Sequence, residues 1–155
     1  MQMLSKKSKY ALRALLALAR RPSEAPVLIA DLAEQEGIPK KFLELILLEL
    51  KNNGILQSKK GKGGGYFLGR KPDVISLGEV IRVLDGPLAP LPCVSQTAYH
   101  MCEECGDEAT CGIRAVMKDV RDATSSILDR ESLADVLRRT ERLQQEKKKV
   151  LVYAI

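Results

Sequence analysis

The chain has 155 residues, of which 45% are hydrophobic and 29% are charged. This length suits one domain with an appendage, and the balance of residue types excludes a wholly disordered chain. No apolar run approaches the ~20 residues that a membrane-spanning helix needs. The lysines of the first ten residues are not followed by the apolar stretch of a signal peptide. We therefore expect a cytoplasmic protein without a membrane partner.

The charge is unevenly divided along the chain. Residues 1–70 contain 13 Lys and Arg against 6 Asp and Glu, whereas residues 71–155 contain 12 against 14. A basic front half favours a module that binds a polyanion, joined to a second functional segment, although unevenly placed surface lysines would give the same imbalance. Aromatic residues make up only 4% and Trp is missing. This composition argues against a stacking platform for single-stranded nucleic acid.

The first part of the chain predicts three helices, at residues 4–21, 29–35 and 39–53. Gly37 can adopt the left-handed conformation of a tight turn between the second and third helices, and Pro39 suits the first turn of the third. Ala33, Gly37 and Leu43 have the residue types and spacing of a helix-turn-helix. Many helical hairpins share this pattern, so it does not by itself establish DNA binding.

A short β-hairpin is expected directly after these helices, with strands at 55–58 and 66–68. Between them lies KKGKGGG, residues 59–65, with three lysines and four glycines. A tip this basic and flexible has no use in a core, but it can press ammonium groups and backbone amides against phosphates or into a minor groove. A Walker-type phosphate loop is excluded because no GK[ST] is present. A helix-turn-helix followed by a basic hairpin is the winged-helix arrangement.

The back half predicts three further helices and one long irregular stretch. Ser76 and Glu79 form a capping box that begins a short helix ending near Leu84. Residues 87–110 show no helical or strand period. The next helix is amphipathic and typical of a dimer interface. The alternative is that it packs back on the first helix of its own chain. Ser132 caps a last helix, and the tail 146–155 has no assigned structure. The apolar seam of the amphipathic helix follows a 4-3-4-3 spacing: Ile113, Met117, Val120, Thr124 and Ile127.

Four cysteines lie in or beside the irregular stretch, with the spacing Cys93-x8-Cys102-x2-Cys105-x5-Cys111. Clustered thiols in a reducing compartment suit zinc, Cu(I) or an iron–sulfur cluster. Only one close pair is present, which favours ligands from a wrapping loop, as in an iron–sulfur site, over a zinc site with two pairs. His100 is a further candidate ligand or a solvated loop residue. The acidic residues nearby are expected to raise the thiol pKa values, which disfavours a reactive nucleophile.

These segments resemble a family of bacterial winged-helix transcription regulators. The family includes the iron–sulfur cluster regulator, the nitrite-sensitive repressor and the cysteine-metabolism repressor. The resemblance spans roughly residues 3–140 and rests on four segments: SKYALRALLALA, IADLAEQEGIPKKFLELILLELKNNGIL, SKKGKGGGYFLGR and CGIRAVMKDVRDA. It implies a mainly α fold with a small β-hairpin wing. The expected organisation is a winged helix-turn-helix domain at 1–86, a cysteine-bearing sensor loop at 87–111, dimerisation helices at 112–145 and the tail at 146–155.

The resemblance also implies a homodimeric repressor that binds a palindromic promoter site in double-stranded DNA. The wing would enter the minor groove next to the recognition helix. The family often has Arg where Lys60 stands, and Lys lacks the bidentate fork that Arg offers to a base. By similarity, the recognition helix presents Lys40, Lys41, Phe42 and Glu44 to the major groove. The residues implied for the wing are Lys59, Lys60, Gly61, Lys62, Gly64, Gly65 and Tyr66.

Cluster-binding members of this family carry three cysteines, commonly separated by five residues. The resemblance therefore implies Cys93, Cys105 and Cys111 as ligands of a [2Fe-2S] or [4Fe-4S] cluster, with Cys102 as a substitute or fourth ligand. The interval between Cys93 and Cys105 departs from this family pattern. The alternatives are a winged-helix regulator that senses zinc, thiol oxidation or a small-molecule or protein effector, and an adaptor without DNA affinity. An enzyme is not expected, because the chain has one histidine and no Gly-rich cofactor loop.

Overall fold

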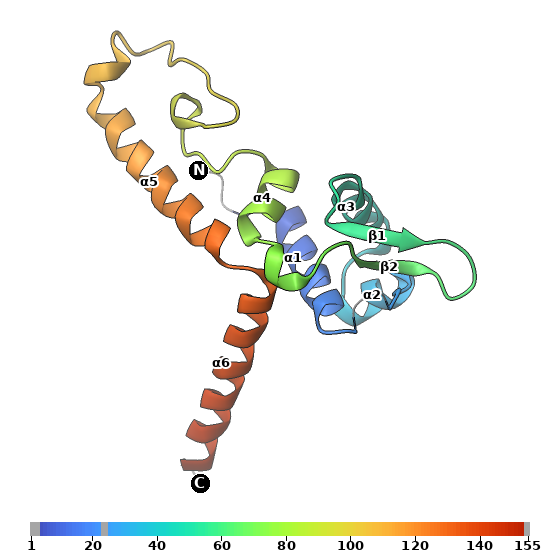
Figure 1. Cartoon of the computed structure of the whole chain (residues 1–155). Coiled ribbons are helices and arrows are strands. Elements are labelled where there is room, and N and C mark those ends of the chain that lie inside the picture. The colour runs from blue at the N-terminus through green and yellow to red at the C-terminus, as the bar shows by residue number, and fades with distance from the viewer. Residues whose placement is uncertain (1–3, 23–24, 154–155) are drawn as a thin grey trace.

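The computed structural model describes residues 4–22 and 25–153, and Figure 1 shows how its elements are arranged. Helices α1 to α4 and the hairpin β1–β2 gather into one body, while α5 and α6 extend from it. Within the described residues, no helix is long and apolar enough to cross a membrane. The elements are α1 (Lys6–Ala19), α2 (Ile29–Glu36), α3 (Lys40–Asn52), β1 (Leu56–Lys59), β2 (Gly65–Leu68), α4 (Leu77–Asp85), α5 (Gly112–Arg130) and α6 (Leu133–Tyr153), with short 3-10 turns at Pro72–Val74, Pro92–Val94 and Glu108–Thr110.

The core forms around α1, which contacts α2, α3, α4 and α6. Ala11, Ala14 and Leu15 are fully buried in its middle. The small alanine side chains allow neighbouring helices to approach closely, so that larger residues of those helices fill the interior at high density. The same core cluster contains the fully buried leucines and isoleucines Leu32, Leu43, Ile46, Leu47, Leu50, Ile55, Ile75 and Leu133.

The predicted helix-turn-helix is confirmed, and both helices lie within one residue of their predicted bounds. Gly37 ends α2 in the left-handed conformation, with φ +60°. The amide of Ile38 then donates to the carbonyl of Ala33 across 2.9 Å. This cap satisfies the carbonyl groups at the end of α2 and reverses the chain toward α3.

The predicted hairpin is also present, as an antiparallel pair in which Leu56 faces Leu68 and Lys59 faces Gly65. Its second strand is additionally paired with Val27, whose amide and carbonyl both bond to Tyr66 at 2.9 Å. Gly65 is required at this crossing because a Cβ there would come within 2.3 Å of the Val27 carbonyl oxygen. The base of the hairpin is therefore fixed to the segment that precedes α2.

The turn between α5 and α6 is built into the core. The Leu77 amide donates to the Glu131 carbonyl, and the Leu133 amide donates to the Ile75 carbonyl, both at 2.9 Å. Leu133 itself is fully buried. As predicted, Ser132 caps α6, since its hydroxyl accepts from the Asp135 amide at 3.1 Å. The first turn of α6 thus belongs to the winged-helix body, and the remainder of the helix leaves it (Figure 1).

Helix α5 packs along α4 and the turn Pro92–Val94, whereas the helix that packs on α1 is α6. Arg82 of α4 holds Asp129 of α5 through two hydrogen bonds of 2.6 and 2.9 Å. The Arg82 guanidinium lowers the pKa of Asp129. Gly78 lies beneath this pair, and a Cβ at Gly78 would lie 2.0 Å from an Asp129 carboxylate oxygen. Glycine at this position therefore leaves room for the Arg82–Asp129 pair between the two helices.

The tail that had no assigned structure is helical as far as it is described. Helix α6 continues from Leu133 to Tyr153, well past the stretch around Leu143 that the apolar spacing predicted. Residues 154 and 155 of the tail lie outside the described part of the chain.

The contribution of the buried Leu133 side chain to the free energy of unfolding can be measured. We expect Leu133→Ala to lower the free energy of unfolding by about 2–5 kcal/mol, because it leaves a cavity where α6 meets the core. Leu28→Ala is the matched control, since Leu28 is 53% exposed and surface truncations usually change stability by less than about 0.5 kcal/mol. Urea denaturation followed by circular dichroism measures both variants. Equal effects would show that α6 is not anchored by Leu133.

Candidate nucleic-acid interface and cysteine loop

Helix α3 has two faces of different character. Its inward face is set by Leu43, Ile46, Leu47 and Leu50, which are fully buried and follow helical spacing. The opposite face begins in the first turn of the helix, where backbone amides are not yet bonded within the helix and favour anions. The side chains exposed on it are those of Lys40, Lys41, Glu44, Leu45, Leu48 and Lys51.

Phe42, which is predicted to face DNA, is half-buried and packs partly against the core. Its ring meets that of Tyr10 of α1 edge to face, with centroids 5.7 Å apart. Lys6 and Arg13 lie over the same Tyr10 ring, at 5.6 and 5.9 Å from its centroid. Phe42 therefore holds α3 against α1, while Lys40, Lys41 and Glu44 occupy the exposed face.

The residues predicted for the wing divide into an exposed tip and a packed base. Gly64 is buried, and a Cβ there would lie 2.3 Å from the Lys59 carbonyl oxygen. Gly65 and Tyr66 are half-buried, and Tyr66 pairs with Val27 as described above. These three residues shape the base of the wing. The exposed tip consists of Lys59, Lys60, Gly61 and Lys62.

The lysines of α3 and of the wing tip are exposed. Within residues 4–22 and 25–153, no ion pair includes Lys40, Lys41, Lys59, Lys60 or Lys62. Such ammonium groups release the counterions of a nucleic acid when they meet its phosphates, which gives a large affinity that depends on salt.

Two arginines of α5 fix the beginning of the cysteine loop. Arg114 donates from Nε to the Cys93 carbonyl at 3.3 Å, and Arg121 donates to the Val94 carbonyl at 2.6 Å. Cys93 is buried between these contacts, whereas Cys102, Cys105 and Cys111 are half-buried. All four are free thiols. Sequence reasoning missed both arginines, which are recognisable only once α5 and the loop are placed together.

Cys111 is the N-cap residue of α5. Its sulfur accepts a hydrogen bond of 3.4 Å from the Arg114 amide, and this bond above all lowers the pKa of the Cys111 thiol. The pKa of Cys105 is raised, chiefly by the neighbouring Cys111 thiol, then by burial and by Cys102. The expectation that acidic neighbours raise the thiol pKa values is therefore wrong for Cys111. For Cys105 its direction holds, but other thiols and burial cause the shift.

The structure brings together only part of the predicted ligand set. Cys102, Cys105 and Cys111 influence one another, and the Cys105 amide donates to the Cys102 carbonyl at 3.3 Å. Cys93 lies at the other end of the loop, and His100 is exposed. Across the described ranges, no three His, Cys, Asp or Glu side chains are arranged to hold a metal ion. The thiol donor set nevertheless has the chemistry that an iron–sulfur cluster requires.

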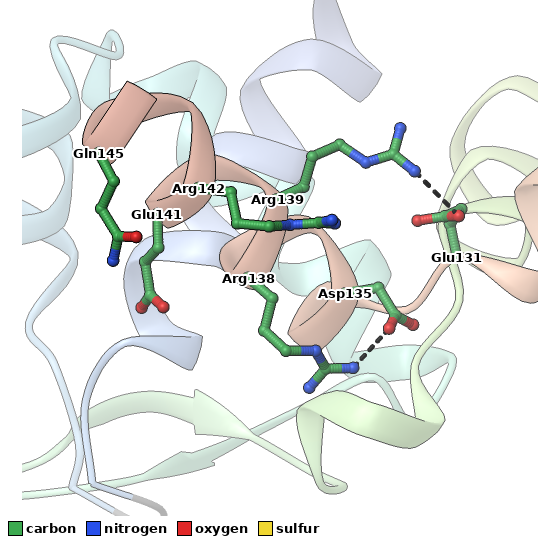
Figure 2. Close-up of a pocket in the computed structure, with 7 residues that line it drawn as sticks. All are labelled: Glu131, Asp135, Arg138, Arg139, Glu141, Arg142 and Gln145. Atoms are coloured by element: carbon green, nitrogen blue, oxygen red, sulfur yellow. Dashed lines mark hydrogen bonds and ion pairs between the residues drawn. The ribbon is translucent and has the colours of Figure 1, made fainter. Parts of the chain in front are cut away.

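A hollow at the base of α6, of about 440 Å³, is lined by charged side chains (Figure 2). Figure 2 shows Arg138 paired with Asp135 at 2.5 Å and Arg139 paired with Glu131 at 3.1 Å. Hydrogen bonds from Ser132, together with Arg138, lower the pKa of Asp135 to about 2. Because its charges largely compensate one another, we regard this hollow as a solvated helix face and not as a ligand site.

The chain is similar to a known family of proteins. The model of the Rrf2 family, described as an iron-dependent transcriptional regulator, matches residues 4–139. The chain belongs to the Rrf2 family. Its members are transcriptional regulators, so the chain is a DNA-binding regulator and not an enzyme.

Individual relatives agree with this assignment. An Rrf2-like helix-turn-helix regulator of Rhodobacter capsulatus is 45% identical, over 87% of this chain and 92% of that protein. The transcriptional regulator IscR of Aliivibrio salmonicida is 36% identical, over 86% and 76%. Among solved structures, CymR, the global cysteine regulator of B. subtilis, superposes with a TM-score of 0.72 at 32% identity, covering 88% of this chain and 96% of CymR. The predicted fold class, mainly α with a small β-hairpin wing, is thereby confirmed.

Proposed function

We propose that this Rrf2 protein is a homodimeric repressor of a palindromic promoter site and acts in the cytoplasm. In this proposal α3 lies in the major groove and the wing tip in the adjacent minor groove. The observation that supports it most is the set of unpaired lysines on the outer face of α3 and on the wing. These lysines are exposed, whereas Gly64 is buried and the rings of Phe42 and Tyr66 pack against the core.

The residues of the two elements would act differently on DNA. Lys40 and Lys41, in the first turn of α3, reach guanine edges or phosphates, and Glu44 accepts from cytosine N4. Lys59, Lys60 and Lys62 neutralise phosphates that border the minor groove. Phe42, Gly64, Gly65 and Tyr66 hold these side chains in position and remain predicted DNA contacts.

The role of the wing can be tested through the salt dependence of binding. We expect Lys60→Ala to weaken binding to all DNA sequences and to reduce the slope of log K against log salt by about one, because one phosphate contact is lost. Fluorescence anisotropy over a range of salt concentrations measures both quantities. Lys147→Ala on the distant α6 is the control and should leave the slope unchanged. An unchanged slope for Lys60→Ala would place the wing away from the phosphates.

The dimer is proposed from the outer face of α5. All 19 residues of this helix are described, and none is buried. Ile113, Val116 and Ile127 are 69%, 57% and 54% exposed. Three large aliphatic side chains on one long helix are typical of a surface that a second copy covers. A two-fold dimer places two copies of α3 on successive half-sites, which requires a palindromic operator.

The dimer interface can be broken by placing a charge on it. We expect Ile127→Glu to shift the protein to monomers and to lower operator affinity at least tenfold, because a carboxylate would be desolvated without a partner. Sedimentation velocity gives the oligomeric state. Gln96→Glu, which adds the same charge to an exposed loop position, should remain dimeric. A dimer that tolerates Ile127→Glu would exclude this face as the interface.

The cysteine loop is proposed as the sensor. Cys93, Cys105 and Cys111 would hold an iron–sulfur cluster, [2Fe-2S] or [4Fe-4S], with Cys102 as a substitute or fourth ligand and His100 as a further candidate. When bound, the cluster would supply a group that responds to oxidants and to iron supply. Support comes from the neighbouring thiols of Cys105 and Cys111 and from the position of Cys111 at the start of α5.

Arg114 would connect the loop to DNA binding. It contacts Cys93 through its side chain and Cys111 through its backbone amide, so a change at either cysteine acts on the first turns of α5. Because α5 is also the proposed dimer helix, its position sets the separation of the two α3 helices. Couplings of this kind are typically about 1–3 kcal/mol.

The cluster is tested by anaerobic purification followed by visible absorption and by iron and sulfide analysis. We expect a brown protein, and we expect Cys93→Ala, Cys105→Ala and Cys111→Ala each to lose colour and iron. Cys102→Ala is the internal comparison and should retain iron if Cys102 is not a required ligand. A protein that remains colourless and free of iron after anaerobic reconstitution would overturn the cluster proposal and leave the winged helix standing.

A second candidate is a thiol switch without a cluster. The neighbouring Cys105 and Cys111 thiols, one with a lowered pKa, favour it. A solved structure of Staphylococcus aureus CymR in an oxidised form is similar to this chain, with 25% identity and a TM-score of 0.67, covering 87% of this chain and 95% of CymR. A colourless protein that gains a Cys105–Cys111 disulfide under peroxide, detected by peptide mass, would support this candidate. One zinc per chain would instead indicate a zinc site.

A further inference from the structure

Two leucines stand on the outer face of α3 among its charged residues. Leu45 is 64% exposed and Leu48 is 48% exposed. Together with Lys41 and Asn52 they follow the spacing i, i+4, i+7 and i+11, which places all four on one stripe of the helix. All four are exposed. An apolar stripe that begins at a lysine is unusual for a face in contact only with water.

The core does not need these two side chains. The interior face of α3 is complete with Leu43, Ile46, Leu47 and Leu50, each fully buried. Leu45 points away from that interior, one residue after Glu44 and one turn after Lys41. Lys40 and Lys41 form no ion pair with any residue that the structure describes, which suits a polyanion better than an apolar protein partner. The occupant of this stripe is therefore DNA, in keeping with the proposed placement of α3.

We propose that Leu45 contacts the C5 methyl group of a thymine in the major groove. This methyl is the one apolar group that base edges present there, and it distinguishes a T·A pair from the other pairs. Leu45 lies in the second turn of α3, beside the residue proposed to accept from cytosine. Leu45 thus sets a preference for thymine at a base pair next to the one that Glu44 contacts. This inference rests on the proposed function and names a specificity residue within it.

The size of the effect follows from the area involved. Burying one methyl group changes an equilibrium by about fourfold. Removing the methyl from the DNA and removing the leucine from the protein eliminate the same contact. The two changes should therefore not add when they are combined.

The experiment uses the full chain and a DNA duplex selected from a random-sequence pool by repeated binding. Each thymine of the selected duplex is then replaced singly by deoxyuridine, which removes only the C5 methyl. We expect the unmodified protein to lose about fourfold in affinity at one thymine of each half-site. Leu45→Ala should bind the parent duplex more weakly and show no loss at that thymine.

Two further variants separate this role from general destabilisation. Leu45→Gln keeps the length of the side chain and should also lose sensitivity to the methyl group, with an unchanged circular dichroism spectrum. Val74→Ala shortens a different side chain that is 57% exposed outside α3, and it should retain the full sensitivity of the parent protein.

Two results would overturn the proposal. One is that the parent protein tolerates deoxyuridine at every thymine, and the other is that Leu45→Ala keeps the same sensitivity as the parent. In both cases a duplex has been selected, so DNA binding itself stands. If no duplex is enriched from the pool, the proposed function fails, and the role of Leu45 fails with it.

Discussion

The orientation of the long helices depends on one short joint between the winged-helix body and α6. Leu133 is fully buried, and the backbone hydrogen bonds between Leu77 and Glu131 and between Leu133 and Ile75 lie on either side of it. An apolar anchor flanked by paired backbone groups allows little rotation, because any movement would expose both the leucine and the polar groups. The proposed dimer face of α5 is therefore held in a defined position relative to α3.

The cysteine loop reaches this joint through α5. Arg114 in the first turn and Arg121 in the middle of the helix fasten the loop to α5, and Arg82 fastens the last turns of α5 to α4 through Asp129. These contacts are polar and partly exposed, whereas the joint at Leu133 is apolar and buried. The buried apolar joint at Leu133, beside the DNA-binding domain, is therefore the firmer attachment. The polar contacts near the thiols are the more adjustable one. A change at the cysteine loop would therefore move α5 as a rigid unit against α4.

The sequence predicts the DNA-binding half well because its signals are local. Gly37 and Pro39 mark a turn whose geometry few other residues allow, and the helices on either side were placed within one residue. The orientation of Phe42 and the leucines of α3 could not be predicted, because FLELILLEL is apolar around most of its circumference. The capping role of Cys111 and the length of α6 were also missed. Both depend on contacts or continuation that a spacing pattern does not contain.

Gly78 gives the joint between α4 and α5 a signature that can be recognised in other chains. A Cβ at position 78 would meet the Asp129 carboxylate and the Arg82 guanidinium, so a relative with alanine or a larger residue there must move this ion pair aside. Such a relative would hold α5 on α4 with a displaced ion pair. The residue at this one position, which lies in neither the proposed DNA-binding face nor the cysteine loop, would then decide how firmly α5 is held on α4.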